Sequence, residues 1–326
     1  MSQLFDSFDK LNIVIIGDVM IDAYLWGKVD RISPEAPVPI VSVTKKEHRL
    51  GGAANVVLNL QALGATPFIC ALVGDDAEGE VFIQLLKKAK ISDKGIIKIK
   101  GRPTTIKTRV IGHNQQILRI DEETEEEISS AQSQIVIQNV SCFLAEHKID
   151  AIIFEDYDKG LITQALIDEV IKQAKQKNIP VIVDPKKRNF LSYKEVDLFK
   201  PNLKELKEGL KLDFDAHNHQ QLQAAVAKLQ SKISAKNVMV TLSELGVYAA
   251  SDTNEKLIPA HIRTVADVSG AGDTVISVTA VCLAAGADIF TAAQIGNLAG
   301  GLVCEKVGVV PINKMQLLTE ALRLES

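Results

Sequence analysis

Short aliphatic runs alternate with helical patterns along most of this chain, and this alternation constrains the fold more than any other feature. Strands that alternate with helices predict a mainly parallel sheet with both faces covered, a three-layer α/β/α sandwich. Aromatic residues make up only 5% of the 326 residues, which favours the aliphatic core of a buried parallel sheet. The strand-like runs are 12–16, 67–73, 151–154, 180–183, 238–241 and 246–249, and the helical patterns include 56–63, 161–177, 203–210, 217–232, 272–286 and 291–306.

Two β-rich segments, about 20–46 and 100–121, do not fit this alternation. Val38–Val43 resembles an edge strand, because Pro39 would interrupt a central hydrogen-bond ladder. Residues 104–121 alternate like the strands of a hairpin. We therefore expect one small β-sheet, a lid made of two insertions into a single domain that spans 1–326.

Composition and charge exclude several classes of protein. The net charge is −4 and the pI is about 5.9, without the basic character of a nucleic-acid binder. The apolar stretch 275–287 is too short to span a bilayer, and the first residues lack a signal-peptide pattern. We expect a cytoplasmic protein with no membrane partner, in which all four cysteines are buried, reduced thiols.

The segment Asp267–Thr274 carries the clearest chemical signal. Gly270 and Gly272 lie at the start of a helical pattern, where backbone N–H groups and the helix dipole can bind an anion. A carboxylate beside such a site, Asp273, suits a base that accepts a proton during phosphoryl transfer to an alcohol. The alternative from the residues alone is a glycine turn in which Asp273 only caps the helix.

Two common nucleotide-binding motifs are missing from the sequence. No G-x-x-x-x-G-K-[ST] occurs, which excludes a P-loop enzyme. Gly17-Asp-Val after the first strand lacks the G-x-G-x-x-G of a dinucleotide fold.

Four segments together resemble the PfkB, or ribokinase-like, family of carbohydrate kinases. Asp267–Asp273 resembles the family's D-T-x-G-A-G-D signature, with Val268 in place of Thr. Gly51–Asn55 is similar to its N-terminal signature. Lys200–Glu205 is similar to its N-x-x-E element, and Thr241–Gly246 to its T-x-G-x-x-G segment. Their order matches the family across nearly the whole chain, which implies a ribokinase-like fold.

The resemblance also implies roles for individual residues. It makes Asp273 the catalytic base and assigns an anion hole to the backbone of Gly270, Ala271 and Gly272. Asn202 and Glu205 would organise Mg²⁺ beside the phosphates of ATP, with Glu205 acting through water; the alternative is a capping box at a helix start. The residues implied for the adenosine side are Thr241, Ser243 (in place of Gly), Gly246 and Asn297, the last with a helix–helix hydrogen bond as its alternative.

A narrower resemblance points to the kinase part of bacterial heptose 7-phosphate kinases, which make precursors of ADP-heptose for lipopolysaccharide. It is carried by Gly17–Asp22, Arg31–Pro39, Lys107–Arg109, Asn114–Asp121, Asp156–Gly160 and Asp184–Lys186. Glu155 departs from the Ser that is frequent in this group. Bifunctional members add a nucleotidyltransferase domain with an H-x-G-H motif. These 326 residues contain no such motif, so we expect a stand-alone kinase.

Several residues are candidates for binding the sugar phosphate. Asp18 follows the first strand, at the edge of the sheet where ligands bind in open α/β folds. Gly51, Gly52 and Asn55 suit a close backbone approach and a polar contact to the sugar. The acidic run 122–127 is interpreted as a solvated surface stretch. The cations available for the distal phosphate are Arg31, Lys107, Arg109, Arg119 and Lys186.

Three functions are consistent with the sequence. The first is ATP- and Mg²⁺-dependent phosphorylation of the anomeric hydroxyl of D-glycero-D-manno-heptose 7-phosphate. The second is a PfkB kinase for another sugar, sugar phosphate or nucleoside, and the third is a catalytically silent sugar-binding protein. We expect a homodimer that pairs its lids. The sequence does not decide whether a monovalent cation is also needed.

Overall fold

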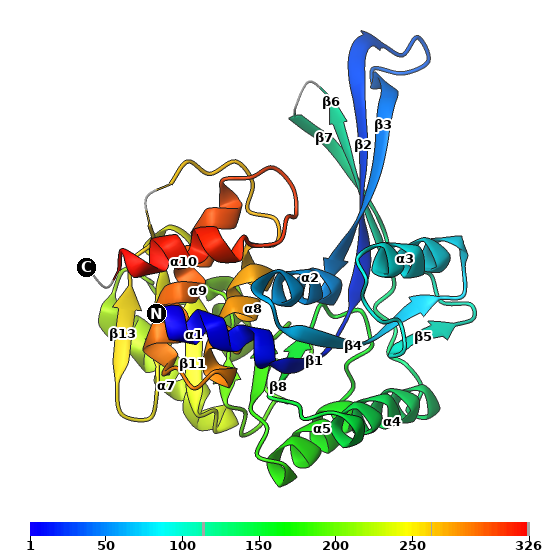
Figure 1. Ribbon diagram of the computed structural model, residues 1–326. Helices are drawn as coiled ribbons and strands as arrows, with labels where there is room; N and C mark the ends of the chain where they lie inside the picture. The colour runs from blue at the N-terminus through cyan, green and yellow to red at the C-terminus, as the bar shows by residue number, and fades with distance from the viewer. Residues whose placement is uncertain (113–114, 262, 325–326) are drawn as a thin grey trace.

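The computed structural model describes residues 1–112, 115–261 and 263–324, and its centre is a sheet in which most neighbouring strands are parallel (Figure 1). The antiparallel pairs lie at one edge, where β12 (Val247–Ala250) pairs with β11 (Asn237–Thr241) on one side and with β13 (Glu255–Ile258) on the other. In spatial order the strands are β13 (Glu255–Ile258), β12 (Val247–Ala250), β11 (Asn237–Thr241), β10 (Leu198–Phe199), β9 (Val181–Asp184), β8 (Ala151–Glu155), β1 (Asn12–Gly17), β4 (Thr66–Gly74) and β5 (Ile96–Ile99).

Helices cover both faces of this sheet. Alternate residues of one strand enter opposite layers: Ile13 and Ile15 of β1 belong to one core, and Val14 and Ile16 to the other. The first core is covered by α1 (Ser2–Ser7), α2 (Ala53–Leu63), α3 (Ala77–Lys88), α8 (Ala271–Ala284), α9 (Ile289–Cys304) and α10 (Lys314–Leu322). The second is covered by α4 (Ser130–Glu146), α5 (Gln164–Gln176), α6 (Leu203–Leu210) and α7 (His219–Ile233).

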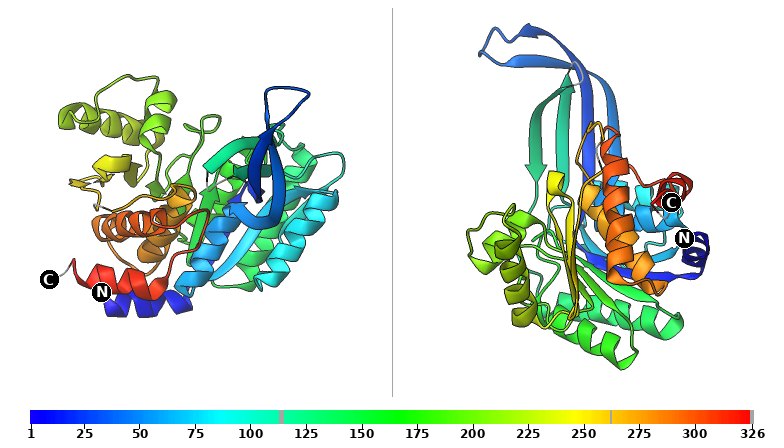
Figure 2. Two further views of the ribbon diagram at one scale, coloured as in Figure 1. Left: turned by 90° about the horizontal axis from the view of Figure 1, so that it is seen from above. Right: turned by 90° about the vertical axis from the view of Figure 1, so that its left-hand side faces the viewer.

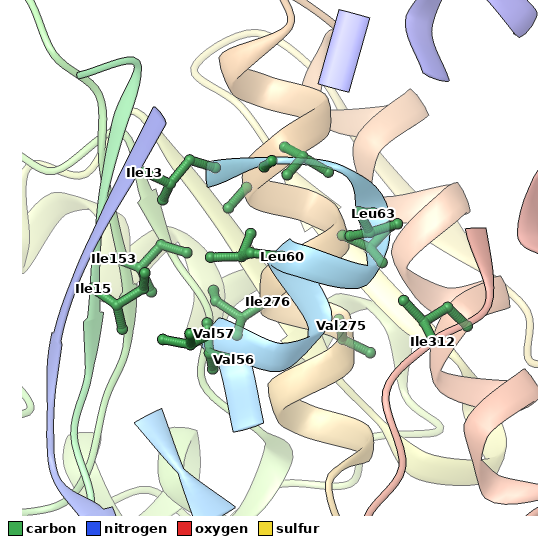
Figure 3. Packing of buried hydrophobic residues seen from close by; sticks show 14 of the residues in the cluster. Ile13, Ile15, Val56, Val57, Leu60, Leu63, Ile153, Val275, Ile276 and Ile312 are labelled. Carbon is green, nitrogen blue, oxygen red and sulfur yellow. The ribbon is translucent and has the colours of Figure 1, made fainter. Parts of the chain in front are cut away.

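The first core holds α8 in place. Leu60 and Val57 of α2 pack beside Ile276 of α8 and against Ile15 of β1 and Ile153 of β8, all fully buried (Figure 3). Burying a large aliphatic side chain stabilises a fold by roughly 1.5–3 kcal/mol. This packing sets where the N-terminus of α8 meets the carboxyl ends of the strands.

A second sheet of four strands stands out from the body and forms the lid (Figure 2). It contains, in spatial order, β3 (Pro39–Gly52), β2 (Val19–Ile32), β6 (Ile106–Gly112) and β7 (Gln115–Glu122). The expectation that two separate segments share one sheet is confirmed, as is the edge position of the strand that contains Pro39. The three-layer α/β/α class is confirmed as well.

Other expectations need correction. Sequence patterning predicts no helix at α1, α4 or α10, and the helix predicted to begin at 161 begins at Gln164. Cys70 and Cys282 are buried free thiols, and Cys304 is only partly buried. Cys142 is exposed, because α4 turns that position away from the core. None of the helices in the described part of the chain combines the length and apolar character that a membrane crossing requires.

Candidate active site

Asp273 lies in the first turn of α8, whose N-cap is Gly270. Gly270 adopts a φ of 79°, a left-handed conformation that favours glycine. The Asp273 side chain is buried and accepts two hydrogen bonds, one from Asn55 Nδ2 at 2.7 Å and one from the Tyr157 hydroxyl at 2.7 Å. The carboxylate is therefore held by α2 and by the loop after β8.

The surroundings of Asp273 push its pKa in opposite directions. Burial raises the pKa of Asp273 above that of an ordinary aspartate, and the charge of Asp184 adds to this. The hydrogen bonds from Asn55 and Tyr157 and the charge of Lys200 lower it. A base with a raised pKa is better suited to take a proton near neutral pH.

The start of α8 also offers space for an anion. A side chain at Gly272 would have only Asp184 Oδ2 at 3.9 Å and Lys200 Nζ at 4.0 Å as neighbours. The Ala271 N–H donates to the Val268 carbonyl at 3.2 Å, so an anion would have to displace this long hydrogen bond to use that donor. The roles of Gly270, Ala271 and Gly272 as an anion hole stay a prediction.

Three charged side chains form a row beneath this turn, at the ends of β8, β9 and β10. Asp184 and Lys200 make a buried ion pair of 2.6 Å. Glu155 pairs in register with Asp184, and its Oε2 has no hydrogen-bond partner among the described residues. Burial, followed by the charges of Asp184 and Asp273, raises the pKa of Glu155 well above the ordinary value.

The oxygens of this region fit a Mg²⁺ ion that also binds phosphate. Carboxylates are the donors that Mg²⁺ prefers, and the ion commonly keeps several waters. Asp184, Glu205 and the unpartnered Oε2 of Glu155 supply such oxygens. Within the described ranges no three acidic, histidine or cysteine side chains form a ready metal cage, so phosphate oxygens and water would have to complete the coordination.

Asn202 and Glu205 form a capping box at the start of α6. Asn202 Oδ1 accepts from the Glu205 N–H at 2.8 Å, and Glu205 Oε2 accepts from the Asn202 N–H at 2.8 Å. The other Glu205 oxygen binds Lys186, whose ammonium lies 5.2 Å from the centre of the Tyr157 ring. The capping box is therefore present. Glu205 is also connected to the site, because Lys186 lies between it and Tyr157, which binds Asp273.

The residues expected on the adenosine side are only partly brought together. Asn202, Thr241 and Ser243 line one cleft of about 590 Å³ with residues of α6, whereas Gly246 and Asn297 do not line it. Asn297 Nδ2 donates to the Pro259 carbonyl at 2.8 Å, a contact between helix and loop. Ser243, where the family has Gly, adopts a positive φ of 53°.

The sugar-side candidates lie at the lid base and on α2, and one of them, Asn55, contacts Asp273. Asp18 is buried, and its carboxylate accepts backbone N–H groups from 157, 159 and 161, so it holds the loop that carries Tyr157. Gly52 has a φ of 59°, and a side chain there would meet the Asp18 carbonyl at 2.5 Å. A side chain at Gly51 would meet Asp22 Oδ2 at 2.2 Å. Asn55 contacts the base itself.

The five predicted phosphate-binding cations do not form one cluster. Lys107, Arg109 and Arg119 lie on the adjacent lid strands β6 and β7, where the two arginines are cross-strand partners. Arg31 is exposed near the end of β2, and Lys186 lies in the body, just after β9. Asn114, part of the narrower resemblance, lies outside the described residues.

The acidic run 122–127 is not only a solvated stretch. Glu123 bridges Lys107 of the lid at 2.9 Å and Lys159 of the loop after β8 at 2.8 Å. Both lysine side chains are largely buried, which explains why an acidic segment lies against them.

Sequence reasoning missed several residues that the fold brings to the site. Tyr157 and Lys200 occur within quoted segments, but nothing local signals their contacts with Asp273 and Asp184. No sequence motif points to Tyr24 or Arg49, although both lie at the lid base. A polar or aromatic residue at the end of a strand is the only signal that could have found Tyr157.

The chain matches the model described as pfkB family carbohydrate kinase over residues 10–315. The chain belongs to the PfkB family. It is therefore a carbohydrate kinase, and kinases of this family use ATP with a divalent metal ion.

Curated relatives and solved structures agree with this membership. The protein named "Bifunctional protein HldE" from Desulfatibacillum aliphaticivorans is 41% identical over 314 residues, which cover 95% of this chain and 63% of the relative. The protein of the same name from Campylobacter jejuni subsp. jejuni serotype O:6 is 42% identical over 312 residues, 95% of this chain and 64% of the relative. The chain thus spans slightly less than two thirds of the length of these relatives.

Two PfkB-type structures confirm the ribokinase-like fold. Phosphofructokinase-2 from Escherichia coli in complex with potassium has a TM-score of 0.78 at 17% identity, covering 97% of this chain and 99% of that chain. Ribokinase from Arabidopsis thaliana, complexed with ribose and ATP, has a TM-score of 0.72 at 19% identity, covering 94% and 98%. At these identities the likeness concerns the fold alone.

Proposed function

We propose that this PfkB kinase transfers the γ-phosphoryl group of ATP to the anomeric hydroxyl of D-glycero-D-manno-heptose 7-phosphate. The product would be heptose 1,7-bisphosphate, a precursor in ADP-heptose and lipopolysaccharide synthesis. The observation that carries the proposed chemistry is the buried Asp273 carboxylate, held by Asn55 and Tyr157 at the first turn of α8. A cytoplasmic location, where ATP is available, fits this activity.

The choice of substrate rests on the narrower resemblance and on the lid. The segments that resemble heptose 7-phosphate kinases include Arg31–Pro39 and Lys107–Arg109, both in the lid. The similarity to proteins named HldE supports the same group. Arginines on the lid strands suit a substrate that already carries a phosphate.

In the proposed reaction the sugar hydroxyl gives its proton to Asp273 as its oxygen attacks the γ-phosphorus. The bond from the γ-phosphorus to the bridging oxygen of ATP breaks, and ADP leaves. The first turn of α8 would stabilise charge on the migrating group. Mg²⁺, when bound with ATP, would offset charge on the phosphate oxygens. Lys186 lies close enough to Tyr157 and Glu205 to contribute on the ATP side.

Different features of the chain bear on the two alternative functions, a kinase for another sugar and a silent sugar-binding protein. A PfkB kinase for another sugar would keep Asp273 and the α8 turn but would not need the lid arginines. A silent sugar-binding protein would need neither the base nor the α8 turn; the intact Gly270-Ala-Gly-Asp273 segment therefore favours an active enzyme.

We further propose that the protein is a homodimer that pairs its lids. One face of the lid carries exposed apolar side chains, with Val43, Leu118 and Ile120 each at least 45% exposed. An open sheet with such a face is prone to associate, and symmetric dimers are the commonest closed oligomers.

Phosphorus NMR of the product tests the proposed reaction. Incubation with ATP, Mg²⁺ and heptose 7-phosphate should yield a second sugar phosphorus signal, coupled to the anomeric proton. Asp273→Asn should keep the fold and lower kcat by about a hundredfold to ten-thousandfold, as expected for loss of a general base. A variant that keeps more than about a tenth of the wild-type kcat would remove Asp273 as the base.

A further inference from the structure

Tyr24 lies at the base of the lid and carries a hydroxyl without a partner. Its side chain is 3% exposed, and the hydroxyl makes no hydrogen bond of normal geometry to any described residue, although the Val309 backbone lies nearby. A buried polar group left unsatisfied costs roughly 1–3 kcal/mol. Such a group points to a ligand that completes it.

Two guanidinium groups flank the same ring. The Arg49 and Arg109 guanidinium carbons lie 4.9 and 5.5 Å from the centre of the Tyr24 ring. Arg49 Nε donates to Glu47 at 2.7 Å, and Arg109 Nη1 donates to Asp22. Because an arginine has five N–H donors, these contacts orient each fork and leave further donors for an anion.

A glycine keeps space beside these donors. A side chain at Gly308 would meet Arg49 Nη1 at 2.6 Å and the Tyr24 hydroxyl at 3.4 Å. Gly308 also has a φ of 75°, which disfavours other residues. The space is thus maintained by both sterics and backbone conformation.

Direct contacts link this group to the catalytic base. Arg49 Nη1 donates to the Val309 carbonyl at 3.1 Å. The Val309 side chain borders Gly270, which borders Asn55, the residue that binds Asp273. The donors and the base therefore lie at two ends of one continuous region.

We propose that Tyr24, Arg49 and Arg109, together the Tyr24 cluster, bind the distal phosphate of the sugar substrate. This inference rests on the proposed function. The two arginines donate to phosphate oxygens with their free N–H groups, and the Tyr24 hydroxyl completes its hydrogen bonding on a third oxygen.

The Tyr24 hydroxyl stays protonated and can therefore donate a hydrogen bond. Burial, followed by the charge of Asp22, raises the pKa of Tyr24, so the hydroxyl keeps its proton at neutral pH. The charge of Arg109 and the nearby Val309 backbone lower the pKa of Tyr24. The Val309 contact does not have the geometry of a normal hydrogen bond.

The other cations are already occupied. Lys107 binds Asp121 at 3.2 Å and Glu123 at 2.9 Å. Arg119 binds Asp121 with two N–H groups and is half exposed. Lys186 binds Glu205 in the body. The arginines of the Tyr24 cluster also bind carboxylates, but the cluster differs from these cations because it places two guanidinium groups beside one buried hydroxyl.

Carboxylates also lie around the Tyr24 cluster, and they affect how strongly each arginine variant should weaken phosphate binding. Asp22 and Glu47 each hold one guanidinium, and the charge of Asp267 acts on Arg109. The two positive charges are therefore largely offset, so recognition depends on directed hydrogen bonds more than on net charge. Arg49→Lys, which keeps the charge but loses the fork, should then weaken binding nearly as much as Arg49→Ala.

The only tryptophan of the chain gives a binding signal that does not depend on turnover. Trp26 stacks on Tyr24 with ring centres 6.1 Å apart and an interplanar angle of 16°. Titration with heptose 7-phosphate in the absence of ATP should change the tryptophan fluorescence of the wild-type protein. Unphosphorylated heptose should bind at least about tenfold more weakly, since about 1.4 kcal/mol corresponds to one decade.

Matched variants test the assignment. Arg49→Lys should raise the Kd for heptose 7-phosphate about tenfold or more, and Tyr24→Phe about fivefold, whereas Arg323→Lys, at the residue that follows α10, should leave it unchanged. Tyr24→Phe should keep or raise the midpoint of thermal unfolding, because the hydroxyl has no partner to lose. A marked loss of stability would assign the hydroxyl a structural role and overturn the proposal.

The possible failures can be told apart. If Arg49→Lys and Tyr24→Phe bind heptose 7-phosphate like the wild type, while the wild type still prefers the phosphorylated sugar, the Tyr24 cluster is not the subsite and the proposed function stands. If the wild type shows no preference for the distal phosphate, the proposed function fails together with this inference.

Discussion

At the residue scale, the proton affinity of Asp273 depends on side chains that are distant in sequence. Tyr157, 116 positions away, donates a hydrogen bond that lowers the pKa of Asp273, while burial raises it. Because the proposed base works only when ionised, activity should fall as the pH drops through this pKa.

Tyr157→Phe should move the acid side of the pH profile of kcat/KM to higher pH. Removing the hydroxyl removes an interaction that favours the ionised carboxylate, so the pKa of Asp273 rises and less base is available at a given pH. Hydrogen bonds to charged groups contribute about 1.5–3 kcal/mol, which corresponds to a loss of about tenfold or more in kcat/KM on the acid side.

Tyr248→Phe is the control for this prediction, because the Tyr248 hydroxyl binds Glu255 on the edge strands. It should leave the profile in place. An unchanged acid limb in Tyr157→Phe would show that Tyr157 does not tune the base.

At the scale of elements, the start of α6 combines a structural and a proposed catalytic role. Glu205→Ala removes both the carboxylate that caps Asn202 and the charge beside Lys186. It should cost about 1 kcal/mol of stability and also lower the Mg²⁺-dependent activity. Binding of ATP without metal should change less.

Glu205→Gln separates the two roles, because its amide oxygen can still accept from the Asn202 N–H. It should retain stability in thermal unfolding but lose Mg²⁺-dependent activity, as Glu205→Ala does. If Glu205→Gln kept the Mg²⁺-dependent activity of the wild type, Glu205 would act only as a helix cap.

The central strands were predictable, and several surface elements were not. β1, β4 and β8 are buried on both faces, so they appear in the sequence as continuous aliphatic runs. α4 carries polar residues within its buried stripe, including Ser133, which weakens the helical pattern. β10 has only two residues, too few for a pattern.

For the active site, the linear motifs located Asp273 and the start of α6, but not the side chains that the fold places around each of them. The buried pair Asp184–Lys200 and the Tyr24 cluster are formed by residues on different strands and loops. Their meeting depends on strand order and lid pairing, which no local pattern specifies. The same reason explains why Arg31 and Lys186 do not join the lid arginines.

At the scale of the whole molecule, the lid is the part with an unpaired apolar face. Register places Leu118 opposite Val110 and Ile120 opposite Thr108, on the face that does not carry the Tyr24 cluster. We expect sedimentation at micromolar concentration to show a dimer. Leu118→Glu should shift it toward monomer, because a charge would be buried in the paired face.

Met315→Glu on α10 is the matched control, since Met315 is exposed but lies outside the lid. It should leave the dimer intact. A wild-type monomer, or a dimer indifferent to Leu118→Glu, would contradict pairing through the lids.

The most direct test of the account is the ratio of kcat/KM for heptose 7-phosphate to that for unphosphorylated heptose, measured with ATP and Mg²⁺. Loss of charge-assisted hydrogen bonds to the distal phosphate should lower kcat/KM by at least about tenfold. Fructose 6-phosphate and ribose serve as comparison substrates and should be poorer than heptose 7-phosphate. Equal kcat/KM with and without the distal phosphate, or a preference for ribose, would contradict the proposed substrate.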